Sequence, residues 1–182
     1  ICRVTSILSH FFMLVVAAAF VMEAVFADSM AHGKPKANGR IPAVANYILP
    51  LLIALIPTLV TYLFQKDYYG TTGLHCFATV PRNIYWGFVI PVWMLTLVSG
   101  LVASLGNLAC DKTNDTQNKE QIFWAKKSCK CLMLLSVFLV LTWSTNLFGS
   151  SEQRLWIFII FFLQSLVLGP AIFIAHTYCH KN

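Results

Sequence analysis

The chain has 182 residues, of which 58% are hydrophobic and only 11% are charged. A water-soluble domain of this size needs far more polar surface, so the composition excludes a soluble globular fold. The formal net charge of +6 does not indicate nucleic acid as a partner, because the basic residues stand in short segments between apolar runs, where orientation in a membrane explains them.

Apolar residues gather in five runs of about 20 residues or more, a length that matches the roughly 30 Å hydrocarbon core of a bilayer. The runs lack the every-second-residue alternation of barrel strands, so they predict helices. We therefore expect an all-α membrane protein, a bundle of five transmembrane helices with spans at about 4–27, 41–65, 84–109, 126–149 and 154–178.

The first run is too long and too irregular for a cleaved signal peptide, since it continues to about Ala27 and contains Glu23. The chain opens on Ile1 with almost no polar lead-in, so we expect an earlier part of a longer protein to be absent. A charge at mid-helix costs about 2.5 to 3.5 kcal/mol on insertion scales, so Glu23 faces a partner or a water-filled cavity, or it reaches the nearby interface. Both interpretations of Glu23 stay open.

The later runs contain prolines and small residues. Each proline within a span removes a backbone donor and bends its helix, which indicates either moving parts or irregular packing; these are Pro50, Pro57, Pro91 and Pro170. A stripe of small side chains in the third run predicts close approach to another helix, through Ser99, Gly100, Ala103, Ser104 and Gly106.

Lysine and arginine in the connecting segments predict the orientation of the chain. Four basic residues fall on the side of the chain start: Arg3, Lys66, Arg82 and Arg154. The other nine fall on the opposite side, which we expect to be cytoplasmic together with the C-terminus: Lys34, Lys36, Arg40, Lys112, Lys119, Lys126, Lys127, Lys130 and Lys181.

This orientation sorts the six cysteines. Cys2 and Cys76 fall on the outer side, where oxidising conditions permit a disulfide. The others fall at the inner edge, where palmitoylation is the modification to expect: Cys110, Cys129, Cys131 and Cys179. The glycosylation sequon at Asn114 also lies on the inner side and is expected to stay unmodified.

Nothing in the sequence indicates catalysis. Only His176 and His180 have the spacing to share a metal on one helix face, and without a carboxylate or second His pair they are better explained as interfacial side chains. His10 and His75 are isolated histidines, which we interpret as packing or loop residues and not as metal ligands. Phosphate-binding loops, nucleophile elbows and paired carboxylates are missing from the sequence. We therefore expect no enzyme activity, metal or cofactor.

The order of motifs resembles helices three to seven of the adhesion receptors, secretin-like G-protein-coupled receptors, and is most similar to their latrophilin branch. The resemblance covers essentially the whole chain. It rests on His10 to Leu14 followed by Glu23, on His75-Cys76-Phe77, on Trp86 followed by Pro91, on Leu141-Thr142-Trp143-Ser144, and on Gly169 to His176. The sequence departs from the family pattern at Ala19, Phe77, Thr145, Asn146 and Leu168.

The resemblance implies a receptor in the plasma membrane whose first two helices and cleavable extracellular region lie outside this chain. An extracellular or tethered peptide would bind among Phe77, Trp86 and Trp143. Glu23, Trp143 and Gly169 would form the activation switch. A heterotrimeric G protein would then engage the cytoplasmic segments, Lys34 to Arg40 and Asp111 to Lys130.

Two alternatives stay open. In a transporter or channel subunit, Glu23 would line the pathway and the prolines would mark broken helices. In a non-signalling fragment, five helices would insert but leave one side of the ligand pocket open.

Overall fold

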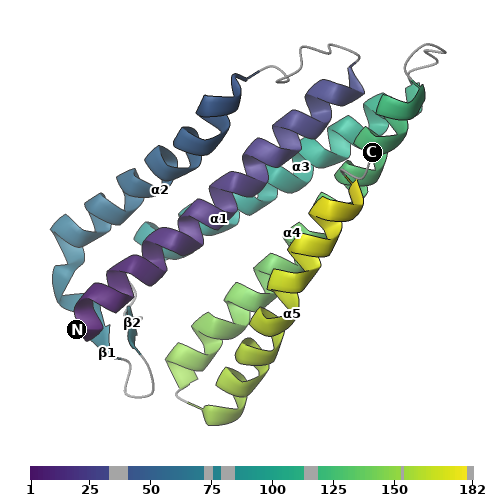
Figure 1. The fold of residues 1–182 in the computed structure, drawn as a ribbon. Helices are drawn as coiled ribbons and strands as arrows, with labels where there is room; N and C mark the ends of the chain where they lie inside the picture. The colour runs from purple at the N-terminus through teal and green to yellow at the C-terminus, as the bar shows by residue number, and fades with distance from the viewer. Residues whose placement is uncertain (33–40, 72–75, 79–84, 113–118, 153, 180–182) are drawn as a thin grey trace.

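A computed structural model describes residues 1–32, 41–71, 76–78, 85–112, 119–152 and 154–179. It confirms an all-α bundle whose five helices are each long and apolar enough to cross a membrane (Figure 1). The helices are α1 (Cys2–Ala31), α2 (Ala43–Gln65), α3 (Ile90–Lys112), α4 (Lys119–Glu152) and α5 (Leu155–Cys179).

Helices α2 and α5 begin and end close to the predicted spans, α1 and α4 extend beyond theirs, and α3 begins at Ile90, after the predicted start near residue 84. In particular, α4 begins at Lys119, before the predicted start near residue 126. The added first turn of α4 carries Lys119 and Glu120, which is possible because a helix needs apolar side chains only where it lies in lipid. Just inside the predicted span, the Lys127 ammonium lies 4.7 Å from the centre of the Trp124 ring, which is cation–π geometry.

Short elements connect α2 to α3. A 3-10 turn, η1 (Lys66–Tyr68), leads into an antiparallel hairpin of β1 (Tyr69–Thr71) and β2 (Cys76–Ala78), in which Tyr69 pairs with Ala78 and Thr71 with Cys76. A π-helical turn, η2 (Tyr85–Val89), then runs directly into α3. We call this end of the bundle the hairpin end.

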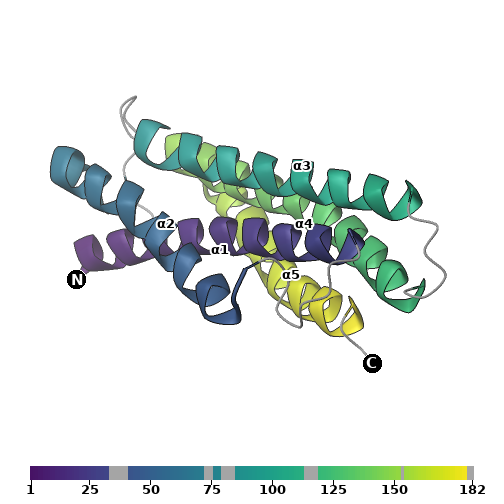
Figure 2. The ribbon, with the colours of Figure 1, turned by 90° about the horizontal axis from the view of Figure 1, so that it is seen from above.

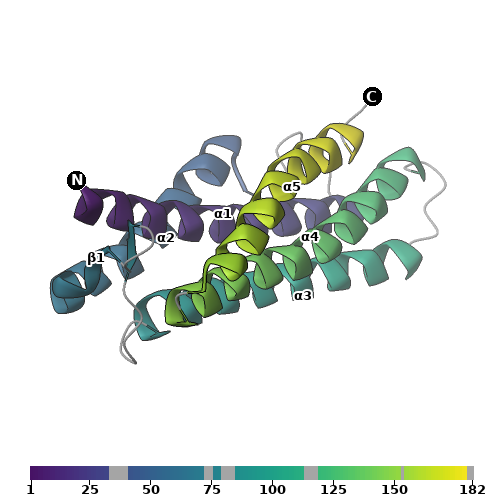
Figure 3. The ribbon, with the colours of Figure 1, turned by 90° about the horizontal axis from the view of Figure 1, so that it is seen from below.

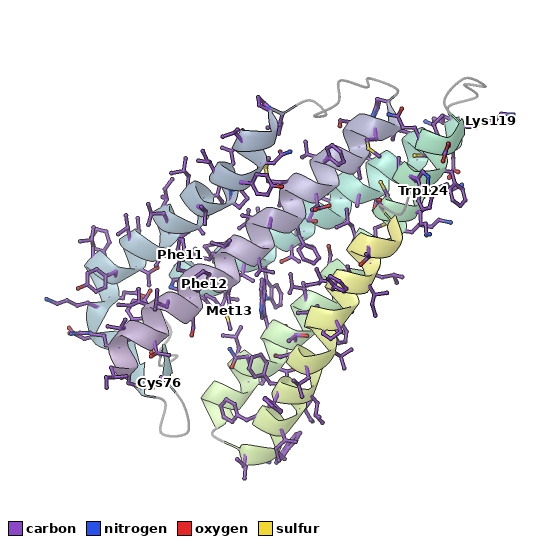
Figure 4. All side chains as sticks on the ribbon, in the orientation of Figure 1. Phe11, Phe12, Met13, Cys76, Lys119 and Trp124 are labelled. Atoms are coloured by element: carbon purple, nitrogen blue, oxygen red, sulfur yellow. A yellow bond between two sulfur atoms is a disulfide. The ribbon has the colours of Figure 1, made fainter. Side chains whose placement is uncertain are left out.

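The opposite end carries the end of α3 and the start of α4, with Lys112 and Lys119, and we call it the lysine end. Figure 4 labels Cys76 at the hairpin end and both Lys119 and Trp124 at the lysine end. We name both ends by the residues that they carry.

Helix α1 lies at the centre of the arrangement, packed against α2, α3 and α4. Figure 1 shows it between α2 on one side and the α3 and α4 pair on the other, and Figure 2 shows α2 crossing it at an angle. Helix α5 packs mainly against α4, and in the view of Figure 3 the two helices lie together at one end and diverge towards the C-terminus. Ile157 is the one buried side chain of α5 among those that the structure describes.

The core is built around small side chains on α1, which allow the backbones of neighbouring helices to approach closely. Ser99 of α3 donates a hydrogen bond to the Phe20 carbonyl oxygen of α1 at 3.0 Å. A Cβ atom built on Gly106 would stand 3.2 Å from the Cα atom of Asp28. The close approach expected of the small residues in the third run is therefore realised against α1.

Large apolar side chains point outward from every helix (Figure 4). Two residues of α1 illustrate the two faces: Leu14 is completely buried, whereas Phe12 is 56% exposed. Side chains of this kind spread over all helices are stable when the surrounding solvent is lipid.

Candidate functional site

A disulfide between Cys2 and Cys76 joins the first turn of α1 to β2, with the two Cα atoms 5.1 Å apart. The structure therefore confirms the disulfide that the sequence analysis considered possible between these two cysteines. It closes a loop over a sequence separation of 74 residues. The hairpin is therefore fastened across the end of the helix on which the core is built.

Polar contacts support the disulfide. Ser6, one turn along α1 from Cys2, donates a hydrogen bond to the Gly70 carbonyl oxygen at 2.8 Å. The Arg3 guanidinium donates to the Lys66 carbonyl oxygen at 2.8 Å and to the Asp67 carboxylate at 3.3 Å. The Arg3–Asp67 pair is exposed, so it contributes at most about 1 kcal/mol. Most of the anchoring comes from the covalent bond and the backbone contact.

One turn further along the same face, His10 meets Tyr69 of β1. The Nδ1 atom of His10 lies 2.5 Å from the Tyr69 hydroxyl oxygen, and the Phe88 ring stands edge-on to the imidazole with ring centres 5.0 Å apart. His10 is 1% exposed and Tyr69 is 3% exposed. The His10 Nε2 atom makes no hydrogen bond within the part of the chain that the structure describes.

Burial raises the pKa of Tyr69 to about 12, because the phenolate would lose its hydration, while a hydrogen bond with Thr61 opposes this shift. The Tyr69 hydroxyl therefore keeps its proton throughout the physiological range. It links α1 to the hairpin through His10.

We call Cys2, Ser6, His10, Tyr69 and Gly70 the anchor cluster. The sequence analysis treated His10 as a lone residue and did not pair it with Tyr69. A signal was present, since Cys2, Ser6 and His10 recur every four residues, which places polar side chains on one face of an otherwise apolar helix.

The aromatic residues that the resemblance assigned to a ligand pocket have different surroundings. Trp143 is 5% exposed and belongs to the core cluster that also contains Leu139 and Val92. Trp86 is 73% exposed in the turn before α3. The backbone of Phe77 lies in β2 and pairs with Gly70, and the structure does not describe the Phe77 side chain. A pocket shared by these three aromatics stays a prediction.

The residues assigned to the activation switch are also separate. Glu23 is half-buried on α1, between the buried Met22 and Ala24. A Cβ atom built on Gly169 would have nothing within 4 Å, so this glycine lies in open space on α5. Leu168 packs against the core cluster that contains Trp143.

In the described part of the lysine end, the Lys126 ammonium pairs with the Asp111 carboxylate, and the His32 Nδ1 atom lies 3.4 Å from an Asp28 carboxylate oxygen. In the described residues, no group of three or more His, Cys, Asp or Glu side chains is placed to hold a metal ion. Several predictions for this side fall outside the described residues, namely those for Lys34 to Arg40, for the Asn114 sequon and for His180.

Fold and composition together define the class: an all-α membrane protein with a disulfide-anchored hairpin across one end of its bundle. Comparisons with protein-family models, with curated proteins and with solved structures gave no significant match to this chain.

Proposed function

We propose that this chain is the later part of a seven-helix receptor of the adhesion type, which passes an extracellular or tethered peptide signal to a heterotrimeric G protein. The observation that carries the proposal is the disulfide between Cys2 and Cys76, which fastens the segment before α3 to the start of α1. The resemblance rests on the order of motifs along the chain, and the two cysteines belong to that order.

The packing is compatible with a signal that crosses the bundle. Trp143 lies in the same buried cluster as Leu14 of α1 and Val92 of α3, and Leu168, beside Gly169, packs against this cluster. A change in the rotamer of such a large buried ring requires its neighbours to move, because protein interiors are close-packed. A ligand that favours one rotamer would thereby shift the bundle between two states.

The lysine end offers basic side chains to a cytoplasmic partner. Lys127 lies over Trp124, and Lys130 is exposed on α4. Acidic groups of a G protein would be attracted to this surface. In this proposal the receptor sits in the plasma membrane with the hairpin end outside.

The first test is the transcript upstream of Ile1. The proposal expects two further apolar runs, preceded by a Cys-rich segment with a His-Leu-Ser or His-Leu-Thr cleavage tripeptide. A start codon immediately before Ile1 would contradict it and would favour a five-helix protein of another kind.

The functional test is a G-protein activation assay on the complete receptor carrying Trp143→Ala. The signal at equal surface expression should fall, because the buried ring is lost from the core cluster. Trp156→Ala is the matched control, since Trp156 is 56% exposed on α5 and should tolerate truncation. An undiminished signal from Trp143→Ala would show that Trp143 is not part of the activation switch.

A further inference from the structure

The outward face of α4 changes from apolar to basic as the helix approaches the lysine end. Its apolar part is a stripe of exposed aliphatic side chains spaced by three or four residues, namely Leu134, Val137 and Leu141. This spacing keeps side chains on one face of an α-helix. Because these large side chains are exposed on a helix long and apolar enough to cross a membrane, the stripe faces lipid.

Lys127 and Lys130 continue the same stripe. Lys130 precedes Leu141 by eleven residues, and Lys127 precedes Leu134 by seven. With 3.6 residues per turn, these separations are close to three and two full turns, so each pair shares one face of the helix. Lys130 is exposed and Lys127 is partly exposed. Both side chains therefore lie on the side of α4 that faces lipid.

An aromatic residue indicates the depth of these lysines. The Lys127 ammonium lies 4.7 Å from the centre of the Trp124 ring, and tryptophan is enriched at the level of the lipid headgroups. Leu134 follows Lys130 by four residues, which is about 6 Å along an α-helix. The two lysines are thus at headgroup level, about one turn beyond the hydrocarbon-facing part of the stripe.

Helix α3 brings another lysine to the same level. Leu101 of α3 and Leu141 of α4 line one surface groove, so the outward faces of the two helices are adjacent. Lys112 follows Leu101 by eleven residues, again about three turns, and it is exposed. The ion pair of Asp111 with Lys126 places the end of α3 beside this part of α4. Two adjacent apolar faces therefore both end in lysine.

The nearby carboxylates of the described residues do not neutralise this face. Asp111 pairs with Lys126, on the side of α4 that faces α3. Glu120 precedes Lys127 by seven residues, so it lies two turns away, about 10 Å along the helix axis and further from the apolar stripe. The region around Lys127 and Lys130 is consequently positive and attracts an anionic group.

We propose that Lys127 and Lys130 bind the phosphate of an anionic phospholipid whose acyl chains lie along Leu134, Val137 and Leu141. Basic clusters beside a membrane span attract anionic lipids in this way. A phosphatidylcholine has the same phosphate, but its choline cancels the charge. A soluble phosphate lacks the acyl chains that the apolar stripe contacts. This inference does not rest on the receptor proposal, because it uses only α3, α4 and the bilayer.

The test uses the full chain in phosphatidylcholine vesicles that contain a trace of photoactivatable phosphatidylglycerol, with its diazirine in the acyl chain close to the headgroup. Phosphatidylcholine with the same chains is the reference, because it differs in the headgroup alone. Irradiation followed by peptide mapping should show preferential labelling of α4 around Leu134 by the anionic lipid. Raising the salt from about 0.1 M to about 1 M should lower this preference, because it shortens the Debye length from about 10 Å to about 3 Å.

Variants at the two lysines test the site itself. Lys127→Gln and Lys130→Gln should each lower the preference for the anionic lipid about fivefold, which corresponds to about 1 kcal/mol per lysine. Lys127→Arg and Lys130→Arg keep the positive charge and should retain the preference. Formation of the disulfide between Cys2 and Cys76 shows that each variant has folded.

Lys126→Gln is the matched control. It removes the same charge from the neighbouring position of α4, but from a side chain that pairs with Asp111. Its preference for the anionic lipid should stay close to that of the unmodified protein.

Three results would overturn the proposal. One is equal labelling of α4 by the two lipids in the unmodified protein. A second is an equal loss of preference in Lys126→Gln and Lys127→Gln, which would reduce the effect to the net charge of the lysine end. The third is an undiminished preference in the double variant of Lys127→Gln and Lys130→Gln, which would leave these lysines to a protein partner.

Discussion

Gly87 lies so close to Thr61 that any side chain at position 87 would collide with it. A Cβ atom built on Gly87 would stand 2.0 Å from Thr61 Oγ1, 2.9 Å from Cγ2 and 3.0 Å from Cβ. Rotation of the Thr61 side chain cannot fully relieve this crowding, since its Cβ atom does not move with the rotation and is itself 3.0 Å away. The π-helical turn before α3 and the end of α2 are therefore in contact because position 87 has no side chain.

We expect Gly87→Ala to destabilise the bundle by about 1 to 3 kcal/mol, the usual effect of overpacking. The midpoint of thermal unfolding in detergent measures this change. Gly100→Ala is the control, because the added methyl group meets open space and alanine favours a helix. Combining Gly87→Ala with Thr61→Ala should recover part of the loss. Equal stability of Gly87→Ala and the unmodified protein would contradict the close approach.

The disulfide gives a second prediction. Loss of a native disulfide typically costs about 2 to 5 kcal/mol, and this one closes a long loop. Cys2→Ser and Cys76→Ser should each lower the unfolding midpoint, and the double variant should be no worse than either single variant, since all three lack the same bond. Cys131→Ser, at the lysine end, should have a smaller effect. Additive losses at Cys2 and Cys76 would show that the residues act separately.

The five helices could be predicted from the sequence because the length and apolarity of a span are local properties. The pairing of Cys2 with Cys76 could be anticipated once the orientation had placed both residues on one side. The contact between His10 and Tyr69 could not, since it joins residues 59 positions apart through a hairpin whose course the sequence did not reveal.

The surroundings of Ser136 were equally hidden from the sequence. A serine in a transmembrane helix ordinarily bonds to the carbonyl four residues earlier, as Ser104 does. Only the structure shows that Ser136 Oγ lacks this bond and that Gly100 leaves space nearby. The stripe of small residues in the third run indicated close packing, and Ser99 and Gly106 do face α1. Gly100 instead lines a groove between α3 and α4 on the surface of the bundle.

The predicted orientation has a direct test at Asn114. With the lysine-rich segments in the cytoplasm, this sequon never meets the glycosylation machinery. Expression in mammalian cells should give a protein whose gel mobility does not change on treatment with a glycan-removing amidase. As a positive control, a sequon in a tag placed before Ile1 should be glycosylated. A glycan on Asn114 itself would show that the chain has the opposite orientation, and it would contradict the proposed G-protein-binding surface.

Alkaline pH provides the last prediction, through Tyr69. Its pKa is raised from 10.0 to about 12 by burial, so the folded state holds the phenolic proton more tightly than the unfolded state. The resulting stabilisation is complete below pH 10 and is lost as the pH rises from 10 towards 12. Tyr69→Phe has no proton to lose at this position and should not show this part of the alkaline decline.

At pH 8, Tyr69→Phe should be less stable than the unmodified protein by about 1 kcal/mol, because it lacks the hydrogen bond to His10. The difference between the two proteins should then shrink as the pH rises from 10 to 12. Unfolding midpoints measured across this range test both statements. Tyr62→Phe, at an exposed position on α2, should follow the unmodified protein at every pH. A constant gap between Tyr69→Phe and the unmodified protein would mean that the Tyr69 hydroxyl titrates equally in the folded and unfolded states, which would contradict the effect of burial on its pKa.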